Sequence, residues 1–340
     1  MQAITIGLDI AKNVFQVHGE DARAGAVLSK RMGRASVERF FAQLPSAVVG
    51  MEACGSAHHW ARVLGSLGHE VRLMPAAYVK PYVKRNKTDA RDAAAICEAV
   101  QRPSMRFVAV KSVEQQCERA LHRARDLLVR QRTQLMNATR AMLAEMGIVA
   151  AQGLKGFAHL RSLVEQGDAA IPALLLPSLS ALVRQWHALD SEAAGLEREI
   201  VARARTDARA RRLMTIPGVG PLTAHAVVAA IGDGRQFACA RDFAAWVGLT
   251  PRQSSSGEKH SSLGITRAGD TGLRRLLTLG AASHLRQMRA RPDKAGPWVT
   301  GILARRPMKV AVVAQAAKTA RIAWAVLTSG EEYWARSVAA

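Results

Sequence analysis

The N-terminal part of the chain is a series of short apolar runs separated by turn-forming residues, and the order of these runs limits the fold more than any other feature. The pattern predicts three consecutive strands at residues 3–9, 14–19 and 26–32. A helix, a strand, a helix and a strand are then expected at residues 36–44, 47–52, 57–67 and 69–74. This order predicts a mixed α/β domain that begins with a three-stranded meander.

A further helix is expected to begin near Thr88, because residues 93–100 are rich in alanine and have apolar periodicity. Thr88 or Asp89 is suited to cap its N-terminus. Asp89 and Asp92 lie three residues apart, so they share one face at the start of this helix. Acidic residues at this place also complement the helix dipole. The pair alone therefore leaves a structural and a catalytic role open.

Two other carboxylates lie where predicted strands end, Asp9 on the first strand and Glu52 on the fourth. The order of three strands, helix, strand, helix, strand and helix is that of an RNase H-like domain. Acids at these four places can hold two divalent metal ions about 3.5–4 Å apart, which stabilise the attacking and leaving oxygens at phosphorus. Mg²⁺ suits such ligands. Each acid alone would be a surface residue, but together Asp9, Glu52, Asp89 and Asp92 predict a metal site.

The chain has 340 residues, and its 48 Lys and Arg against 27 Asp and Glu give a net charge of +21. Such an excess predicts a polyanionic partner, DNA or RNA, with an anionic membrane surface as the competing explanation. No transmembrane run or signal peptide is expected, because the apolar stretch at residues 310–327 is interrupted by Lys318 and Arg321. Four scattered cysteines without a CxxC pair indicate reduced thiols in a cytoplasm and argue against zinc.

The middle of the chain predicts long helices with a coiled-coil-like seam. In residues 112–146 the heptad positions are Leu121, Leu128, Leu135 and Met142. A second seam has Leu182, Leu189 and Leu196, interleaved with Leu179, Trp186, Ala193 and Ile200. The two helices could pack within one chain or between chains, so a homo-oligomer is expected. The arginines of the first helix leave three roles open, namely a solvated face, a track for a nucleic-acid backbone, or an oligomer contact.

A third region begins near residue 210, where the sequence of residues 213–221 precedes an alanine-rich helix. This pattern predicts the hairpin of a helix-hairpin-helix motif. Gly218 and Gly220 would let backbone N–H groups approach a phosphate at the start of the next helix, without selecting a base sequence. The alternative is a plain turn between two helices.

A serine-rich segment follows a short apolar helix expected at residues 242–248, and its composition predicts a flexible loop. Its chemistry alone does not mark a nucleophile, because only His260 is near in sequence. Four cationic side chains around this segment are candidates to bind a scissile phosphate and stabilise its transition state. They are Arg252, Lys259, Arg267 and Arg274.

Taken together, these blocks resemble the DEDD transposases of insertion-sequence family 110, relatives of the Piv-type DNA invertases. The four acids match the family's RuvC-like DEDD domain. The C-terminal pattern is Pro–x–x–x–Ser–Ser–Gly, then Gly–Ile–x–Lys/Arg–x–Gly–Asn/Asp, then Leu–Arg. It is met by Pro251, Ser255, Ser256, Gly257, Gly264, Ile265, Arg267, Gly269, Asp270, Leu273 and Arg274. Arg267 stands where lysine is common, which keeps the charge and changes the hydrogen-bonding geometry.

The resemblance implies an RNA-guided recombinase of an insertion sequence, acting in a bacterial cytoplasm. A non-coding bridge RNA from the element would pair with donor and target DNA. The acids of one subunit would bind Mg²⁺ and meet the serine of another subunit within a tetramer. That serine would form a covalent phosphoserine link to DNA. Three consecutive serines leave the nucleophile between Ser255 and Ser256, and Ser256 is the first choice because it directly precedes Gly257.

Three domains are expected: a RuvC-like catalytic domain at residues 1–110, a helical coiled-coil region at 111–208, and a mostly helical transposase domain at 209–340. Two other functions stay open. A junction-resolving endonuclease would use the acids without a covalent intermediate. A non-catalytic nucleic-acid-binding protein would have a degenerate nuclease fold.

Overall fold

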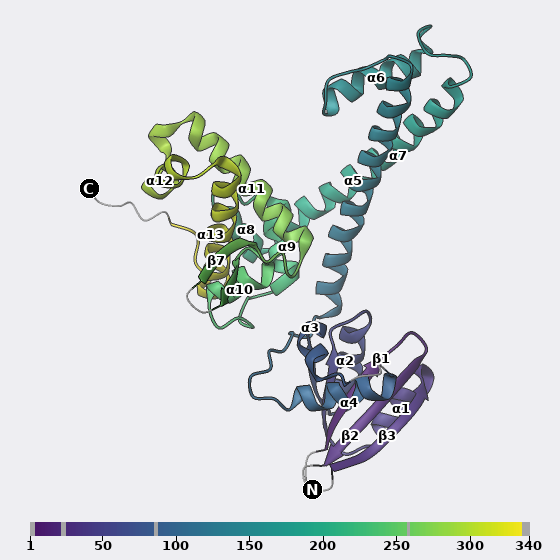
Figure 1. Cartoon of the computed structure of the whole chain (residues 1–340), viewed down its shortest axis with the longest axis vertical. Coiled ribbons are helices and arrows are strands. Elements are labelled where there is room, and N and C mark those ends of the chain that lie inside the picture. The colour runs from purple at the N-terminus through teal and green to yellow at the C-terminus, as the bar shows by residue number, and fades with distance from the viewer. Residues whose placement is uncertain (1–3, 22–24, 85–87, 257–258, 335–340) are drawn as a thin grey trace. The chain divides into compact units, whose positions relative to one another are not determined.

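The structure is a computed structural model, and it describes residues 4–21, 25–84, 88–256 and 259–334. The chain divides into two compact units, Met1–Glu114 and Gln115–Ala340 (Figure 1). The first is a mixed α/β unit built on a five-stranded sheet, and the second is mostly helical. The expected boundary near residue 110 lies close to this division, and the finer division into three domains stays a prediction.

The sheet of the first unit has the strand order β3-β2-β1-β4-β5. Strand β1 pairs antiparallel with β2 and parallel with β4, and β4 pairs parallel with β5. The five strands are β1 (Thr5–Ile10), β2 (Val14–Asp21), β3 (Gly25–Gly33), β4 (Val48–Glu52) and β5 (Glu70–Met74). All five predicted strands are confirmed, with ends that differ by a few residues.

Helices cover both faces of this sheet. One face forms an apolar core with α1 (Val37–Ala42) and α2 (Ala57–Ser66), in which Phe15 packs edge-on against Trp60 at 5.0 Å. The other face is covered by α4 (Asp89–Val100), which contacts β1, β2 and β4. Short helical turns at Ala76–Val79 (α3) and Lys80–Tyr82 precede α4, and the sequence pattern did not predict them.

Glycine sets the distance between α4 and the sheet. A Cβ atom on Gly7 would lie 2.0 Å from the backbone oxygen of Ala93, so only glycine permits this approach. A Cβ on Gly50 would similarly lie 2.8 Å from Cβ of Val100. The helix therefore packs directly on the backbone of β1 and β4.

The second unit begins with two long antiparallel helices, α5 (Val113–Glu145) and α7 (Leu176–Thr206), which lie side by side in Figure 1. Three ion pairs join them at intervals of seven residues along α5, and each pairs an arginine with a carboxylate. They are Glu118 with Arg203, Arg125 with Glu197, and Arg132 with Asp190. Helix α6 (Leu154–Gln166) packs near their far ends around Leu143, Leu160 and Val183.

Because these ion pairs join α5 and α7 of the same chain, the two predicted helices pack within one chain. Each charged residue of α5 in the pairs lies three residues before a predicted seam leucine, as Arg125 does before Leu128. On α7 the whole interleaved set is buried, namely Leu179, Trp186, Ala193 and Ile200, and Leu189 of the other set is buried as well. The two long helices are confirmed, but the predicted seam of α5 is not fully buried, because Met142 is 38% exposed and the buried residues of this helix are Thr139 and Leu143. The layer of ion pairs was not foreseen.

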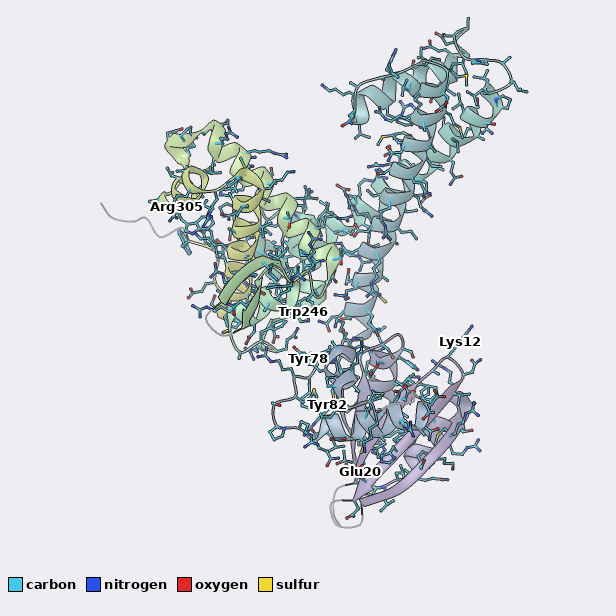
Figure 2. All side chains as sticks on the ribbon, in the orientation of Figure 1. Lys12, Glu20, Tyr78, Tyr82, Trp246 and Arg305 are labelled. Carbon is cyan, nitrogen blue, oxygen red and sulfur yellow. The ribbon has the colours of Figure 1, made fainter. Side chains whose placement is uncertain are left out.

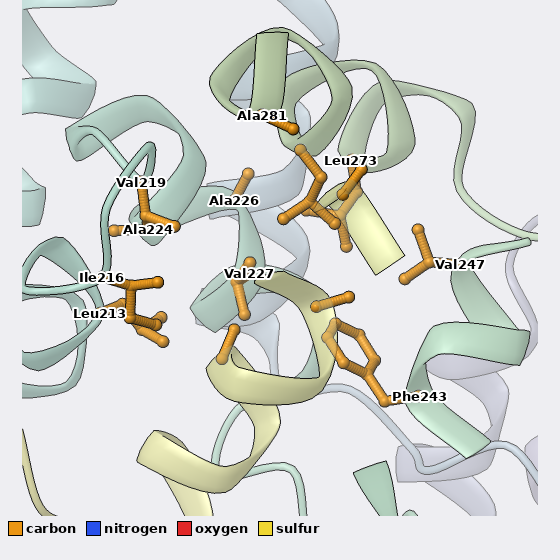
Figure 3. Close-up of a cluster of buried hydrophobic side chains, with 14 of the residues drawn as sticks. Leu213, Ile216, Val219, Ala224, Ala226, Val227, Phe243, Val247, Leu273 and Ala281 are labelled. Atoms are coloured by element: carbon orange, nitrogen blue, oxygen red, sulfur yellow. The ribbon is translucent and has the colours of Figure 1, made fainter. Parts of the chain in front are cut away.

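The remaining helices form one apolar core, part of which Figure 3 shows. They are α8 (Ala208–Met214), α9 (Pro221–Ile231), α10 (Ala240–Val247), α11 (Thr271–Ala290), α12 (Pro297–Arg305) and α13 (Met308–Ser329). Helix α13 is long and apolar enough to cross a membrane by length and composition, but half of its most apolar window is buried. Its alanines, such as Ala316 and Ala320, are fully buried against α11 and other helices of this core.

The serine-rich segment is a β-hairpin, so the prediction of a flexible loop was wrong. Strand β6 (Pro251–Ser256) pairs antiparallel with β7 (Lys259–Ile265). Backbone groups make this pairing, and the Thr266 amide continues it by donating to the Thr250 carbonyl at 2.9 Å. Composition misled the prediction because serine is common in loops, whereas strand pairing uses backbone groups that every serine supplies.

Candidate active site

Asp9 and Glu52 lie on neighbouring parallel strands, on the same face of the sheet. The register pairs Leu8 with Met51, so the next residue on each strand is a carboxylate. Side chains alternate along a strand, and Gly7 and Gly50 face α4. Asp9 and Glu52, two residues further on, therefore also face α4.

The direction of α4 brings its acidic start toward the same end of the sheet. Ala93 lies against Gly7, and four residues later the Cys97 thiol donates to the Thr5 carbonyl at 3.3 Å. The helix thus runs toward the start of β1, and its own first turn lies toward the end that carries Asp9. That first turn holds Asp89 and Asp92, with Thr88 as the N-cap accepting from the Arg91 amide. The choice between Thr88 and Asp89 as N-cap is thereby settled.

A cysteine that sequence analysis did not connect with the site lies beside these acids. Partial desolvation raises the pKa of the Cys54 thiol, although the residue is exposed overall, and the charges of Glu52 and Asp9 raise it further. Both carboxylates therefore act on one thiol. Among the described residues no group of three or more His, Cys, Asp or Glu side chains is close enough to hold a metal ion. The roles of the four acids stay predictions.

The predicted helix-hairpin-helix lies between α8 and α9, and its two glycines differ. Gly218 has φ +83°, and a Cβ there would lie 2.7 Å from the Gly280 carbonyl oxygen on α11. Packing against α11 therefore explains why residue 218 is glycine. Gly220 caps α9, and nothing lies within 4 Å of a Cβ built on it. A hollow of about 800 Å³ adjoins this hairpin and is lined in part by Arg125 and Arg275.

The four cationic residues around the serine hairpin differ in exposure and in hydrogen bonding. Arg274 donates to the carbonyls of Val247 and Ala268, at 2.9 and 2.6 Å, and so ties the segment before α11 to α10. Arg252 and Arg267 are exposed, and Arg267 has φ +56°. The side chain of Lys259 lies outside the described residues. Phosphate contacts for these four stay predictions.

For the candidate nucleophiles the structure describes the backbone only. Ser255 and Ser256 are the last two residues of β6, and Ser255 pairs with His260. Their side chains and all of Gly257 lie outside the described residues. The motif residue Gly269 has φ +68°, and a Cβ there would lie 1.8 Å from the Trp246 carbonyl oxygen, so it needs glycine for packing.

The six arginines of α5 that were left open divide into two groups. Four are engaged: Arg119 with Asp270, Arg125 with Glu197, Arg132 with Asp190, and Arg140 with the carbonyls of Ala150 and Gly153. Arg123 and Arg130 are exposed, and within the described part of the chain they have no hydrogen-bond or ion-pair partner. Both of these line a cavity of about 640 Å³.

Sequence analysis missed a partly buried chain of titratable groups beside this cavity. Nε2 of His122 lies 2.8 Å from Nδ1 of His225, whose Nε2 lies 2.9 Å from Oε2 of Glu118. This last contact is at ion-pair distance, and Oε2 of Glu118 has no hydrogen-bond partner among the described residues. Burial and the neighbouring His225 lower the pKa of His122 to about 4, and burial lowers that of His225. No sequence pattern links residues more than 100 positions apart.

Known families match both parts of the chain. Residues 6–148 match a transposase model of the DEDD type for IS110, and residues 210–295 match the model described as Transposase IS116/IS110/IS902 family. A "Probable family 20 transposase" of Pseudomonas aeruginosa is 48% identical over 332 residues, covering 96% of this chain and 98% of its own length. The chain belongs to the IS116/IS110/IS902 family of transposases. The resemblance inferred from the acids and the serine motif is thus confirmed.

Other relatives of the transposase agree with this assignment. A "Transposase for insertion sequence element IS1328" of Yersinia enterocolitica is 40% identical, with 96% of this chain and 97% of that protein covered. A "Pilin gene-inverting protein" of Moraxella bovis is 42% identical over 76 residues, which are 22% of this chain and 23% of that protein. As a member of this family, the transposase is a DNA-processing enzyme.

Proposed function

We propose that this transposase is an RNA-guided, site-specific DNA recombinase of an insertion sequence, and that its first unit is an RNase H-like (RuvC-like) nuclease domain. The observation that carries the proposal is the arrangement around α4. Asp9 and Glu52 face this helix, and its first turn carries Asp89 and Asp92 toward the same end of the sheet. Three separate elements thus carry acids toward the same end of the sheet, which supports a shared role for them.

The four side chains suit a hard divalent cation such as Mg²⁺, because all offer carboxylate oxygens. Asp9, Glu52, Asp89 and Asp92 would hold the ion, and the Cys54 thiol beside them stays protonated because its pKa is raised. When bound, such ions stabilise negative charge on the oxygens at a reacting phosphorus. The first turn of α4 fixes two of the four carboxylates through its Thr88 cap.

In the proposed reaction Ser256 attacks a DNA phosphorus. A bond forms between Oγ and phosphorus while the bond from phosphorus to one DNA oxygen breaks. The hydroxyl proton passes to a base, and the departing DNA oxygen takes up a proton. The product is a phosphoserine link that a second DNA end can later attack, which restores the serine and completes strand exchange. Ser255 is the second choice for this role.

Guide RNA and a tetramer are also part of the proposal. The net charge of +21 supports binding of more than one nucleic acid. Exposed apolar side chains on α5 and near its far end support contacts between copies, since large exposed apolar side chains grouped in one region indicate an interface. They include Leu127, Met142, Met146 and Leu174, which is 94% exposed. Light scattering would give the mass of the assembly, and sequencing of co-purified RNA would test for the guide.

The decisive experiment looks for an SDS-resistant protein–DNA adduct in cells that carry the element and its flanking DNA, so that native RNA is present. Wild type, Asp9→Asn, Ser255→Ala and Ser256→Ala are compared. We expect the adduct in wild type and in Ser255→Ala, and its loss in Ser256→Ala and Asp9→Asn, with all four proteins present at equal levels.

Other outcomes would redirect the proposal. Cleaved DNA without an adduct in wild type would indicate a junction-resolving endonuclease, in which Asp9→Asn is inactive and Ser256→Ala is active. An adduct kept in Ser256→Ala but lost in Ser255→Ala would move the nucleophile by one residue. Neither cleavage nor adduct in wild type, with the flanking DNA present, would favour a non-catalytic nucleic-acid-binding protein.

A further inference from the structure

The second unit contains a cavity that the proposed reaction does not use. It has a volume of about 640 Å³ and lies between one face of α5, helix α9, helix α10 and the start of α11. Four arginines line it, against two aspartates, Asp126 and Asp270. The lining therefore has an excess of positive charge, which favours an anionic ligand.

The arginines of this cavity are of two kinds. Arg119 and Arg275 are neutralised, because Arg119 pairs with Asp270 at 2.8 Å and Arg275 pairs with Asp126. Arg123 and Arg130 lack such partners within the described ranges, and they lie two helical turns apart on α5. At about 1.5 Å per residue their separation is about 10 Å, which lets both reach successive phosphates of one strand.

An aromatic ring supplies the other half of the site. Trp246 on α10, which Figure 2 labels, is half-buried and lines the cavity. Phe243 stacks on it with ring centroids 6.1 Å apart, and Phe237 meets it edge-on at 5.7 Å. Two rings thus hold the indole in place, and an aromatic surface next to unpaired arginines is the combination that binds unpaired bases.

His122 adds a fixed hydrogen-bonding group to the cavity wall. Nε2 of His122 lies 2.8 Å from Nδ1 of His225, so this contact uses Nε2 of His122 and leaves its Nδ1 for a ligand. With its pKa lowered to about 4, His122 is uncharged at neutral pH. It therefore offers a ligand one hydrogen-bonding nitrogen and adds no charge.

We propose that this cavity binds one unpaired nucleotide of a single-stranded nucleic acid, with its base on Trp246 and the adjoining phosphates at Arg123 and Arg130. The site would hold a base in a single-stranded segment of the nucleic acid. This deepens the proposed function, since it rests on nucleic-acid binding, but it is independent of Ser256 and of the four acids. DNA and RNA share the chemistry, and the experiment separates them.

The test uses the full-length transposase with fluorescent 12-nucleotide single strands of DNA and of RNA, and with a duplex of the same sequence. We expect Trp246→Leu to weaken single-strand binding about tenfold and to leave duplex binding unchanged, in keeping with base stacking. Trp298 lies on another helix, so Trp298→Leu is the matched control and should bind like wild type. The strand with the larger loss identifies DNA or RNA as the preferred source.

The arginines are tested by the salt dependence of the same binding. Arg123→Gln with Arg130→Gln should lower the slope of log affinity against log salt by about 1.4 for single strands, because two phosphate contacts are lost. Arg184→Gln, an exposed arginine on α7, should leave the slope unchanged. Equal slopes for wild type and the double variant would overturn the assignment of the phosphates.

A measurement on the wild-type protein tests the site even if Trp246→Leu does not fold. A single strand carrying 5-iodouracil is crosslinked by light, and the attached peptide is identified by mass spectrometry. A crosslink at Trp246 supports the proposal, and crosslinks at other residues only would overturn it. Strand cleavage by Trp246→Leu in the adduct assay is scored separately, so loss of the proposed chemistry and loss of this site give different results.

Discussion

The two units of the transposase both use glycine to bring a helix against another backbone, but they collect opposite charges near that contact. In the first unit Gly7 admits α4, and acids face the junction. In the second, Gly218 and Gly280 admit one another, and Arg125 and Arg275 line the hollow beside them. In both units, close packing of backbones determines where the charged side chains lie. Ion pairing then determines how many of these side chains are left to bind a ligand.

The largest effect is expected where a side chain is added at the first junction. In Gly7→Ala the new Cβ would lie 2.0 Å from the Ala93 oxygen and 2.5 Å from the Cys97 amide nitrogen. These are backbone atoms, so α4 must move, and we expect the free energy of unfolding of this unit to fall by about 3 kcal/mol. Chemical denaturation followed by circular dichroism measures it.

Two other alanine variants sharpen this prediction. Gly55→Ala, with no atom within 4 Å, should leave stability unchanged within about 0.5 kcal/mol. Gly280→Ala brings its Cβ within 2.0 Å of the Gly218 oxygen, but it gains about 1 kcal/mol of helix propensity, so its loss should be smaller than that of Gly7→Ala. Equal stability of Gly7→Ala and Gly55→Ala would contradict the packing argument.

The sequence predicted the first unit well because its information is local. Each strand there is a short apolar run bounded by turn residues, and Thr88 marks the start of α4 within a few positions of the acids. The second unit depends on distant pairs. Nothing near Arg125 indicates that it meets Glu197 while Arg123 meets no described partner, and nothing near His122 indicates His225. Side-chain partners across helices were therefore beyond the sequence, although the two long helices were not.

The second prediction concerns pH and belongs to the second unit. The pKa of His122 is lowered from 6.5 to about 4, so between these values the unfolded chain binds a proton that the folded chain does not. Stability should be highest above pH 6.5 and fall as the pH decreases toward 4. We expect a loss of about 1–2 kcal/mol between pH 7.5 and 5, reduced by the partial exposure of the ring. Urea unfolding at both values measures it.

A variant isolates the contribution of this histidine. His122→Gln places an amide nitrogen near the position of Nε2, where it can donate to Nδ1 of His225, but it cannot take up a proton in this range. Its stability should therefore change less with pH than that of wild type. The same pH dependence in both proteins would show that other groups cause it.

The ion pairs between α5 and α7 provide a third test of the comparison. Arg125 is 16% exposed and donates twice to Oε2 of Glu197, at 2.6 and 3.1 Å. A double-mutant cycle with Arg125→Met and Glu197→Gln should give a coupling energy of about 1 kcal/mol. The exposed pair of Arg72 and Glu70 in the first unit should give no more than about 0.3 kcal/mol by the same method. Equal couplings would show that the α5–α7 pairs are ordinary surface contacts.

The smallest effect is expected at the helix caps, where the two units again differ. Oγ1 of Thr88 accepts from the Arg91 amide at 3.4 Å, a long contact, so Thr88→Ala should cost about 0.5 kcal/mol. Asp207, which caps α8, accepts from the Arg209 amide at 2.7 Å, and Asp207→Ala should cost about 1 kcal/mol. Thermal unfolding of the two variants gives this order. A larger loss for Thr88→Ala would mean that the cap supports more than the first turn of α4. Because that turn carries Asp89 and Asp92, strand cleavage by Thr88→Ala should then fall together with its stability.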